Sequence, residues 1–358
     1  MTRCILFLAL ACSLPALAQT EAAGTAAAAK PKAADKAQVQ AAPKLTPEQL
    51  LTQFRHDQIN LLATRADAHS LLAAALMAVP DSKDAHRPTA HKPPALIARA
   101  QAADPDDVLV WWASAALECH QTDKPCPQPE TLQKLEGLDA TNAAVWALSL
   151  LRAQRTKDVP AARAALTSAA QAQKYDDAFG RLVAVVEDAQ NILPVGDEII
   201  KASGELASAE GYELLTAAGV VVHLLPPLEK AIGEACADAA QNEDTHADCV
   251  ALARKIAVSG SLNAQGFGIS QLLALLPAGA ELEVARAKQR SHAWHLARIG
   301  EFAERLAVDP GLTRIYLQEL HETGMESAAV LAVLRSENVP LEPPSDWKVP
   351  EPDAPAEP

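Results

Sequence analysis

Acidic helix-start segments recur in the first half of the chain at a nearly constant spacing. Segments 104–107 (DPDD), 139–142 (DATN) and 175–177 (YDD) each precede an apolar stretch with helical periodicity. The marks at Asp104, Asp139 and Asp176 lie 35 and 37 residues apart, and each interval has room for two helices and one loop. A period of this length is typical of a helical-hairpin array, in which each hairpin buries an apolar face against its neighbour. We expect the helices that follow the three marks to pack side by side, with Trp111 and Trp146 in equivalent sites of their own hairpins.

Composition agrees with a helical fold. Alanine supplies about one residue in five of the 358, whereas Gly is only 15, Phe 5 and Tyr 3. Alanine is the best helix former and a poor strand former, so a mostly-β fold is excluded. The hydrophobic fraction of 49% is enough for a packed core and rules out wholesale disorder. We therefore expect an all-α fold: a helical-hairpin array followed by an irregular α-helical bundle.

Segment 1–18 has the features of a secretory signal peptide. Arg3 supplies the positive charge, Ile5–Leu14 is an apolar run, and 16–18 (ALA) is a small-x-small cleavage site. The apolar run is too short to span a membrane, and no later segment reaches roughly 18 uninterrupted apolar residues. We expect a mature chain that begins at Gln19, lacks a transmembrane segment and is periplasmic or secreted. A lipoprotein processed at Cys12 is the alternative.

The remaining sequence divides into four parts. Residues 19–44 contain no Leu, Ile or aromatic residue and predict a flexible Ala-rich tail. Residues 45–190 hold the periodic hairpins, and residues 197–337 are helical in pattern but aperiodic, which predicts a separate C-terminal α-helical domain. Residues 340–358 are proline-rich and acidic. We expect that tail to be extended, with Trp347 packed back onto the body.

The hairpins at 65–181 resemble the tetratricopeptide repeat family. Trp146 stands at the family's aromatic position of helix A. Ala162, Leu166 and Ala169 stand at its small, large and small positions of helix B. Ala100 and Pro105 match the closing Ala and Pro of an earlier repeat. The family's Leu-Gly pair is replaced by Ser149-Leu150, and Gln128 stands where a small Ala is expected. The resemblance covers about a third of the chain. An irregular bundle of Ala-rich hairpins is the alternative.

The resemblance implies a binding groove along the inner faces of the A helices. Mapped onto this sequence, the groove residues are Trp112, Ala116, Cys119, His120, Ala147, Leu151, Gln154 and Arg155. The Lys and Asn residues with which the family clamps a carboxylate are absent from these positions, so the implied groove is apolar and is not expected to grip a C-terminal carboxylate. The expected partner is a protein or peptide. The alternative is that a neighbouring helix fills the groove, which would make Trp112 a core residue.

Four cysteines remain after the signal peptide: Cys119, Cys126, Cys236 and Cys249. An even number in an exported protein predicts disulfides. The short separations favour the local pairs Cys119–Cys126 and Cys236–Cys249, each of which closes a loop between two predicted helices. Zinc binding together with the neighbouring histidines is the alternative, but the paired ligand spacing of a zinc finger is absent. No Cys-x-x-Cys redox motif occurs either.

No motif for catalysis is recognisable. The Gly-rich segment 260–268 lacks the Lys-Ser/Thr end of a phosphate-binding loop, and neither a nucleophile elbow nor a dinucleotide fingerprint occurs. His292 and His295 share one helix face but lack the Glu of a His-Glu-x-x-His zinc motif. We therefore expect no catalytic residues, no metal and no cofactor.

Charge narrows the partners further. The net charge of -14 without a basic patch argues against nucleic acid and anionic lipid. The prediction is an exported, non-enzymatic protein-interaction or scaffold protein. An exported α-helical enzyme, hydrolase-like and with its site around His292 and His295, is the alternative.

Overall fold

The computed structural model describes residues 45–79, 90–120, 122, 124–204, 208–237, 239 and 242–350. In those residues it contains sixteen α-helices and no β-strand, which confirms the predicted all-α fold. None of these helices is long and apolar enough to cross a membrane. The predicted signal peptide, the 19–44 tail and the processing positions Cys12 and Gln19 lie outside the described residues, as does the end of the C-terminal tail, 351–358.

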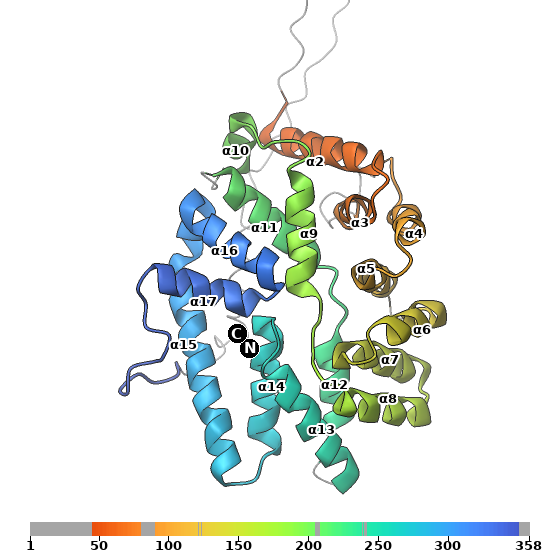
Figure 1. The fold of residues 1–358 in the computed structure, drawn as a ribbon, viewed down its shortest axis with the longest axis vertical. Helices are drawn as coiled ribbons and strands as arrows, with labels where there is room; N and C mark the ends of the chain where they lie inside the picture. The colour runs from red at the N-terminus through yellow and green to blue at the C-terminus, as the bar shows by residue number, and fades with distance from the viewer. Residues whose placement is uncertain are drawn as a thin grey trace, which may run out of the picture.

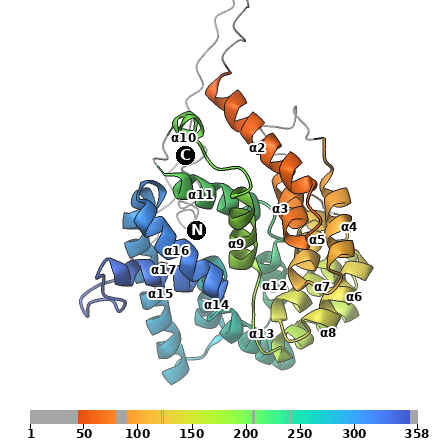
Figure 2. The same ribbon diagram turned by 45° about the horizontal axis from the view of Figure 1, so that its top comes forward.

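The helices are arranged as two groups on either side of a central helix (Figure 1). They are α2 (Pro47–Ala63), α3 (Ala68–Met77), α4 (Pro93–Ala103), α5 (Val108–Cys119), α6 (Pro129–Leu138), α7 (Ala143–Thr156), α8 (Val159–Gln171), α9 (Phe179–Gln190), α10 (Asp197–Ser203), α11 (Ala209–Val222), α12 (Leu228–Cys236), α13 (Glu243–Ile256), α14 (Leu262–Leu275), α15 (Ala280–Val308), α16 (Pro310–Thr323) and α17 (Glu326–Ser336). Helices α3–α8 form a column on one side, α15–α17 lie on the other, and α9 runs between them, as the turned view in Figure 2 also shows.

Helices α3 to α8 pack in chain order. Each of them contacts the next, most extensively within the α3–α4 and α7–α8 pairs, and α3 also contacts α5. Helix α3 is buried on all sides along 71–77 (LLAAALM), since none of these residues is more than 2% exposed. A helix that is apolar all round must be covered by neighbours on every face, and its run of small alanines lets those neighbours approach closely.

The sequence period reappears in the way the helices begin. Asp107, Asn142 and Asp177 each accept a hydrogen bond from the backbone N–H two residues later, with N···O distances of 2.7, 3.1 and 3.1 Å. Such side-chain caps satisfy N–H groups that have no partner inside the helix. Asp107 and Asn142 are the N-cap residues of α5 and α7, whereas Asp177 precedes the N-cap of α9, Ala178, by one residue. The three acceptor residues are spaced by 35 and 35 residues, more evenly than the marks chosen from the sequence.

Trp111 and Trp146 occupy equivalent positions, as the sequence predicts. Each lies four residues after its capping residue and is half-buried. Each donates its indole N–H to the carbonyl six residues earlier, at 2.8 Å to Pro105 and 2.9 Å to Ala140. The first turns of α5 and α7 are therefore built in the same way.

The prediction that the helices after the three marks pack side by side is wrong. Helix α9 packs chiefly on α11, α3 and α16, and α7 packs on α8 and α12. The physical reason lies in α9 itself, which buries Leu182, Val183 and Val186 and so presents apolar side chains on more than one face. A helix with so wide an apolar surface needs partners from both groups.

The two groups share one hydrophobic core, which continues from Ile59 through the column, across α9 and on to Ala329. The column α3–α8 also contacts the helices that follow α11 in the chain, because α12 packs on α7 and α13 packs on α8. Polar contacts strengthen this second junction: Arg163 of α8 pairs with Asp248 of α13 at 3.0 Å.

Both predicted disulfides are present. Cys119 and Cys126 join the end of α5 to the segment before α6, with their Cα atoms 5.2 Å apart. Cys236 and Cys249 join the end of α12 to α13, with their Cα atoms 5.9 Å apart. All four side chains are buried. Each bond therefore ties together two consecutive helices.

Candidate functional site

The groove implied by the repeat resemblance is closed in this structure. Five of its residues are core, none more than 6% exposed: Trp112, Ala116, Cys119, Ala147 and Leu151. Helix α12 packs on α7, and Gln154 donates to the carbonyl of Ala231 on α12 at 2.8 Å. Arg155 lies against the disulfide loop and donates to the carbonyl of Lys124 at 3.1 Å. Helix α12 therefore covers the α7 part of the implied groove, and Trp112 on α5 is a core residue, as the alternative expects.

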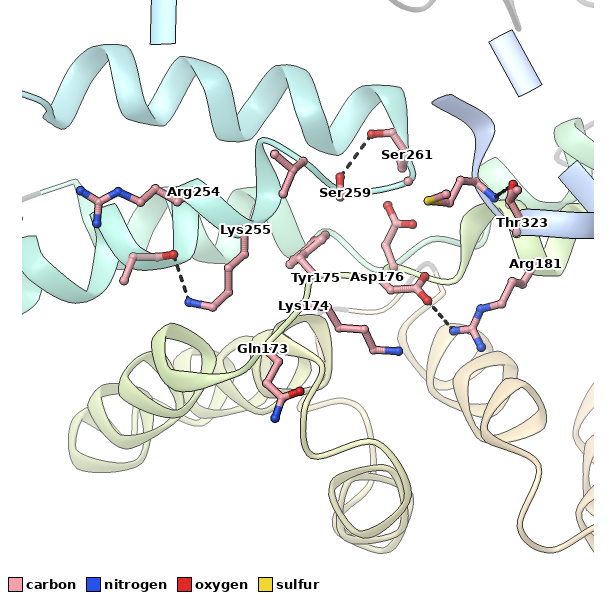
Figure 3. A pocket seen from close by; sticks show the side chains of 17 residues that line it. Gln173, Lys174, Tyr175, Asp176, Arg181, Arg254, Lys255, Ser259, Ser261 and Thr323 are labelled. Carbon is pink, nitrogen blue, oxygen red and sulfur yellow. Dashed lines mark hydrogen bonds and ion pairs between the residues drawn. The ribbon is translucent and has the colours of Figure 1, made fainter. Parts of the chain in front are cut away.

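A cavity of about 550 Å³ lies elsewhere, where three connections meet (Figure 3). Its walls come from the α8–α9 connection and the start of α9, from the end of α13 with the α13–α14 connection, and from the α16–α17 turn. These segments are distant in the sequence, and the cavity exists only because the two groups of helices are docked together. None of the groove residues implied by the resemblance lines it.

Asn142 fixes the position of the α8–α9 connection. Its side chain is fully buried, accepts from the backbone N–H of Asp176 at 2.9 Å and donates to the carbonyl of Asp176 at 2.8 Å. The backbone N–H of Ala143 donates to the carbonyl of Lys174 at 2.7 Å. Because the same asparagine caps α7, the first wall of the cavity is tied directly to the hairpin column.

Two glycines allow the α16–α17 turn to lie against α9. A Cβ atom at Gly180 would come within 2.3 Å of the carbonyl oxygen of Gly324. Gly324 itself has a φ of 68°, a left-handed conformation that ends α16 and that glycine adopts without strain. A Cβ there would lie 2.6 Å from the Cγ of Arg181. The turn therefore packs directly beside the Arg181 side chain, which lines the cavity.

Four cations line the cavity, namely Lys174, Arg181, Arg254 and Lys255. The first three have carboxylate partners: Asp139 at 3.6 Å, Asp176 at 2.9 Å and Glu281 at 2.6 Å, respectively. These carboxylates largely neutralise the three cations, so the lining contains charges of both signs.

Lys255 differs from the other three cations because no carboxylate pairs with it in the described part of the chain. Its ammonium donates to the carbonyls of Ala170 at 2.6 Å and Ala251 at 3.2 Å. An ammonium has three N–H donors, so one remains for a further acceptor. Burial, and then the positive charge of Arg254, lower the pKa of Lys255. Each of these costs would be reduced by an anion bound in the cavity.

Two carboxyl groups in and beside the cavity wall have raised pKa values. Burial raises the pKa of Asp177, which lines the cavity, to about 6, and the negative charge of Asp176 adds to the rise. Burial also raises the pKa of Glu326, next to the lining residue Met325, to about 7, although its carboxylate accepts from the backbone N–H of Leu262 at 2.8 Å. Each carboxyl group is therefore easier to protonate than an exposed one.

The rim of the cavity is apolar. Val258 is 63% exposed and Met325 is 42% exposed, and both line the opening. The lining contains neither histidine nor cysteine. The hydroxyl of Ser259 donates within the α13–α14 connection, to the carbonyl of Ser261 at 3.4 Å. The arrangement suits the binding of an acidic group that carries an apolar substituent.

The two histidines named in the sequence lie away from this cavity, on α15. Burial, together with the charge of His295, lowers the pKa of His292 to about 4, and Gly266 of α14 leaves room for the His292 ring. His295 bonds through Nε2 to the carbonyl of Leu341 at 2.8 Å. In the residues that the structure describes, no group of three His, Cys, Asp or Glu side chains is placed to hold a metal ion.

A second carboxyl cluster lies at the junction of α9, α11 and α16. Glu187 and Glu213 are each only 6% exposed, and His321 lies 2.6 Å from the Glu187 carboxylate. That hydrogen bond raises the pKa of His321. Burial, followed by the charges of Glu187 and Glu210, raises the pKa of Glu213 to about 7.

Glu213 provides a test of this electrostatic description. A carboxyl whose pKa is higher in the folded chain favours folding when protonated, and this contribution is lost as the pH rises from about 4.5 to about 7. We expect Glu213→Gln to raise the melting temperature at pH 8 and to leave it nearly unchanged at pH 4.5. Glu234→Gln, at an exposed position, is the matched control and should leave the melting temperature nearly unchanged at both pH values. A lower melting temperature of Glu213→Gln at pH 8 would contradict the assignment.

The cavity was not predictable from the sequence, although parts of it gave signals. The Asp176 mark and the Gly-rich segment 260–268 both contribute to its walls, but each was assigned only a local role. The fold and the cavity define an all-α, disulfide-bonded protein with a pocket lined by charges of both signs. No protein-family model matches this chain, and neither a curated protein nor a solved structure matches it.

Proposed function

We propose that this chain is an exported, non-enzymatic binding protein built on tetratricopeptide-like hairpins, periplasmic or secreted, and that its cavity binds an acidic group next to an apolar one. The observation that carries the proposal is Lys255, a cation in the cavity wall with one unused N–H and no carboxylate partner among the described residues. A bound carboxylate would supply the missing acceptor and form a charge-assisted hydrogen bond.

The apolar rim supports the second part of the proposed ligand. Exposed apolar side chains scattered over a surface need no explanation, but Val258 and Met325 lie together at the mouth of one cavity. The C-terminal residue of a peptide with an apolar side chain and a free organic acid with an alkyl chain share this chemistry. A volume of about 550 Å³ is within the range of small-ligand sites and holds either.

The test compares ligands that differ only in charge. An N-acetylated tripeptide that ends in leucine is titrated as the free acid and as the carboxamide, and hexanoate represents the free organic acid. We expect the free-acid peptide to bind at least roughly tenfold more tightly than the amide, which corresponds to about 1.4 kcal/mol. Tight binding of hexanoate alone would assign the cavity to organic acids, and tighter binding of the peptide would assign it to chain ends.

Variants at Val258 test the location. Its side chain is exposed, so changes there should leave the melting temperature unaltered. We expect Val258→Asp to weaken binding of the free-acid peptide and Val258→Lys to strengthen it, each by about threefold to tenfold, since a unit charge near the surface contributes on the order of 1 kcal/mol. Isothermal titration calorimetry measures both.

Val284 provides the matched control, because it is 57% exposed and lies on α15 outside the cavity lining. Val284→Asp should bind the free-acid peptide like the parent chain. Equal affinities of the acid and the amide, or equal effects of Asp at the two positions, would rule out the proposed site.

A further inference from the structure

The proline-rich segment after α17 folds back along α15. Asn338, with a φ of 57°, ends α17, and the chain then continues without helix through Val349. The rings of Trp347 and Trp294 meet edge to face, with their centroids 5.4 Å apart. The prediction that Trp347 packs back onto the body is therefore confirmed.

Side chains of α15 hold this segment through its backbone. Three of them donate hydrogen bonds to four of its carbonyl oxygens. The pairs are Trp294 Nε1 to Pro340 at 2.7 Å, His295 Nε2 to Leu341 at 2.8 Å, Arg290 Nε to Trp347 at 3.0 Å, and the Arg290 terminal nitrogen to Pro344. Contacts of this kind depend on the path of a backbone and little on its side chains.

The α15 face selects for proline by its chemistry. A guanidinium and an indole donate hydrogen bonds and accept none, and His295 acts as a donor here because its partner is a carbonyl. A surface of donors suits a segment that is rich in free carbonyls and poor in N–H groups. Proline has no N–H, and proline-rich segments are already extended, so less conformational entropy is lost when they bind.

Charged and polar side chains lie on both sides of this contact. Arg290 and Arg298 belong to α15, and the Arg298 guanidinium sits 4.5 Å from the centroid of the Trp294 ring and pairs with Glu301 of the same helix at 2.8 Å. The segment carries Glu342 and Asp346, and the hydroxyl of Ser291 donates to the Glu342 carboxylate at 3.3 Å. An acidic, proline-containing segment therefore meets a face with two arginines and a hydroxyl donor.

We propose that the α15 face formed by Arg290, Ser291, Trp294 and His295 is a docking site for extended, acidic, proline-rich peptide segments. The chain's own residues 340–347 are the occupant seen here, and a partner's segment of the same chemistry displaces them. This inference is independent of the cavity, since none of these α15 residues lines it.

The experiment uses the full-length chain and a fluorescein-labelled peptide with the sequence of residues 340–350. In the parent chain the tethered segment competes at an effective concentration in the millimolar range, so the free peptide should bind weakly. Trp347→Ala weakens the tethered occupant and leaves the α15 face intact. We expect the peptide to bind this variant at least roughly tenfold more tightly than the parent chain, as measured by fluorescence anisotropy.

Three further measurements make the result specific. Lys348→Ala, at an exposed tail residue with no hydrogen bond or ion pair among the described residues, should behave like the parent chain. Arg290→Gln added to Trp347→Ala should abolish the gain, as should replacing the four prolines of the peptide by alanine. Circular dichroism checks that each variant is folded. Equal binding to Trp347→Ala and the parent chain, or undiminished binding after Arg290→Gln, would overturn the proposal.

Discussion

Trp112→Ala is expected to lower the free energy of unfolding by about 3–5 kcal/mol, the usual cost of truncating a buried aromatic side chain. Trp112 is only 1% exposed and belongs to the core that both groups of helices share. A loss of this size is a large fraction of the stability of an ordinary domain. Chemical denaturation followed by far-ultraviolet circular dichroism gives the value.

The chain supplies its own control in the neighbouring residue. Trp111 is half-buried, so we expect Trp111→Ala to cost less than half as much despite its hydrogen bond to Pro105. Trp112→Phe should be tolerated far better than Trp112→Ala, because the Trp112 indole N–H is buried without a hydrogen-bond partner in the described residues and its loss leaves nothing unpaired. Equal costs at 111 and 112 would show that the packing of α5 is misassigned.

Reduction of both disulfides is the second large effect, at about 5 kcal/mol in total. The bonds close loops with sequence separations of 7 and 13 residues. In the chain-entropy account, closing loops of this length restricts the unfolded state by about 2.5 and about 3 kcal/mol. We therefore expect a lower melting temperature with reductant than without, and the Cys236→Ser/Cys249→Ser chain to lose slightly more stability than Cys119→Ser/Cys126→Ser.

A chain that carries all four serine replacements is the control for the reductant. Its melting temperature should be low and should not respond to reduction. Peptide mapping without reductant should show the 119 and 126 peptides joined, and likewise those of 236 and 249. Four free thiols, crossed pairing or an unchanged melting temperature after reduction would be inconsistent with the bonds described.

Local features of this fold were readable in the sequence because local chemistry determines them. The helix starts at Asp107 and Asn142 follow from side chains that cap N–H groups two residues away. The disulfide pairs follow from short separations between predicted helices, and the packing of Trp347 follows from the large apolar surface of its side chain. Each of these depends on a few neighbouring residues.

The long-range arrangement was not readable in the same way. The position of α9 depends on partners in both groups of helices, and the repeat spacing alone placed it beside α7. Helix α12 fills the implied groove on α7, but nothing in its own sequence indicates which helix it will cover. The cavity also needs close backbone approach at Gly180 and Gly324, which only the docked structure shows.

Hydrogen–deuterium exchange with and without the free-acid leucine tripeptide tests the central claim most directly, because it locates binding along the chain. The claim is that ligand binds where the α8–α9 connection, the end of α13 and the α16–α17 turn meet. We predict that the free-acid peptide slows exchange in segments 173–181, 251–261 and 323–325 together. The amide should slow exchange in none of them. Protection confined to 147–155 on α7, or no protection in the three segments at saturating peptide, would contradict the account.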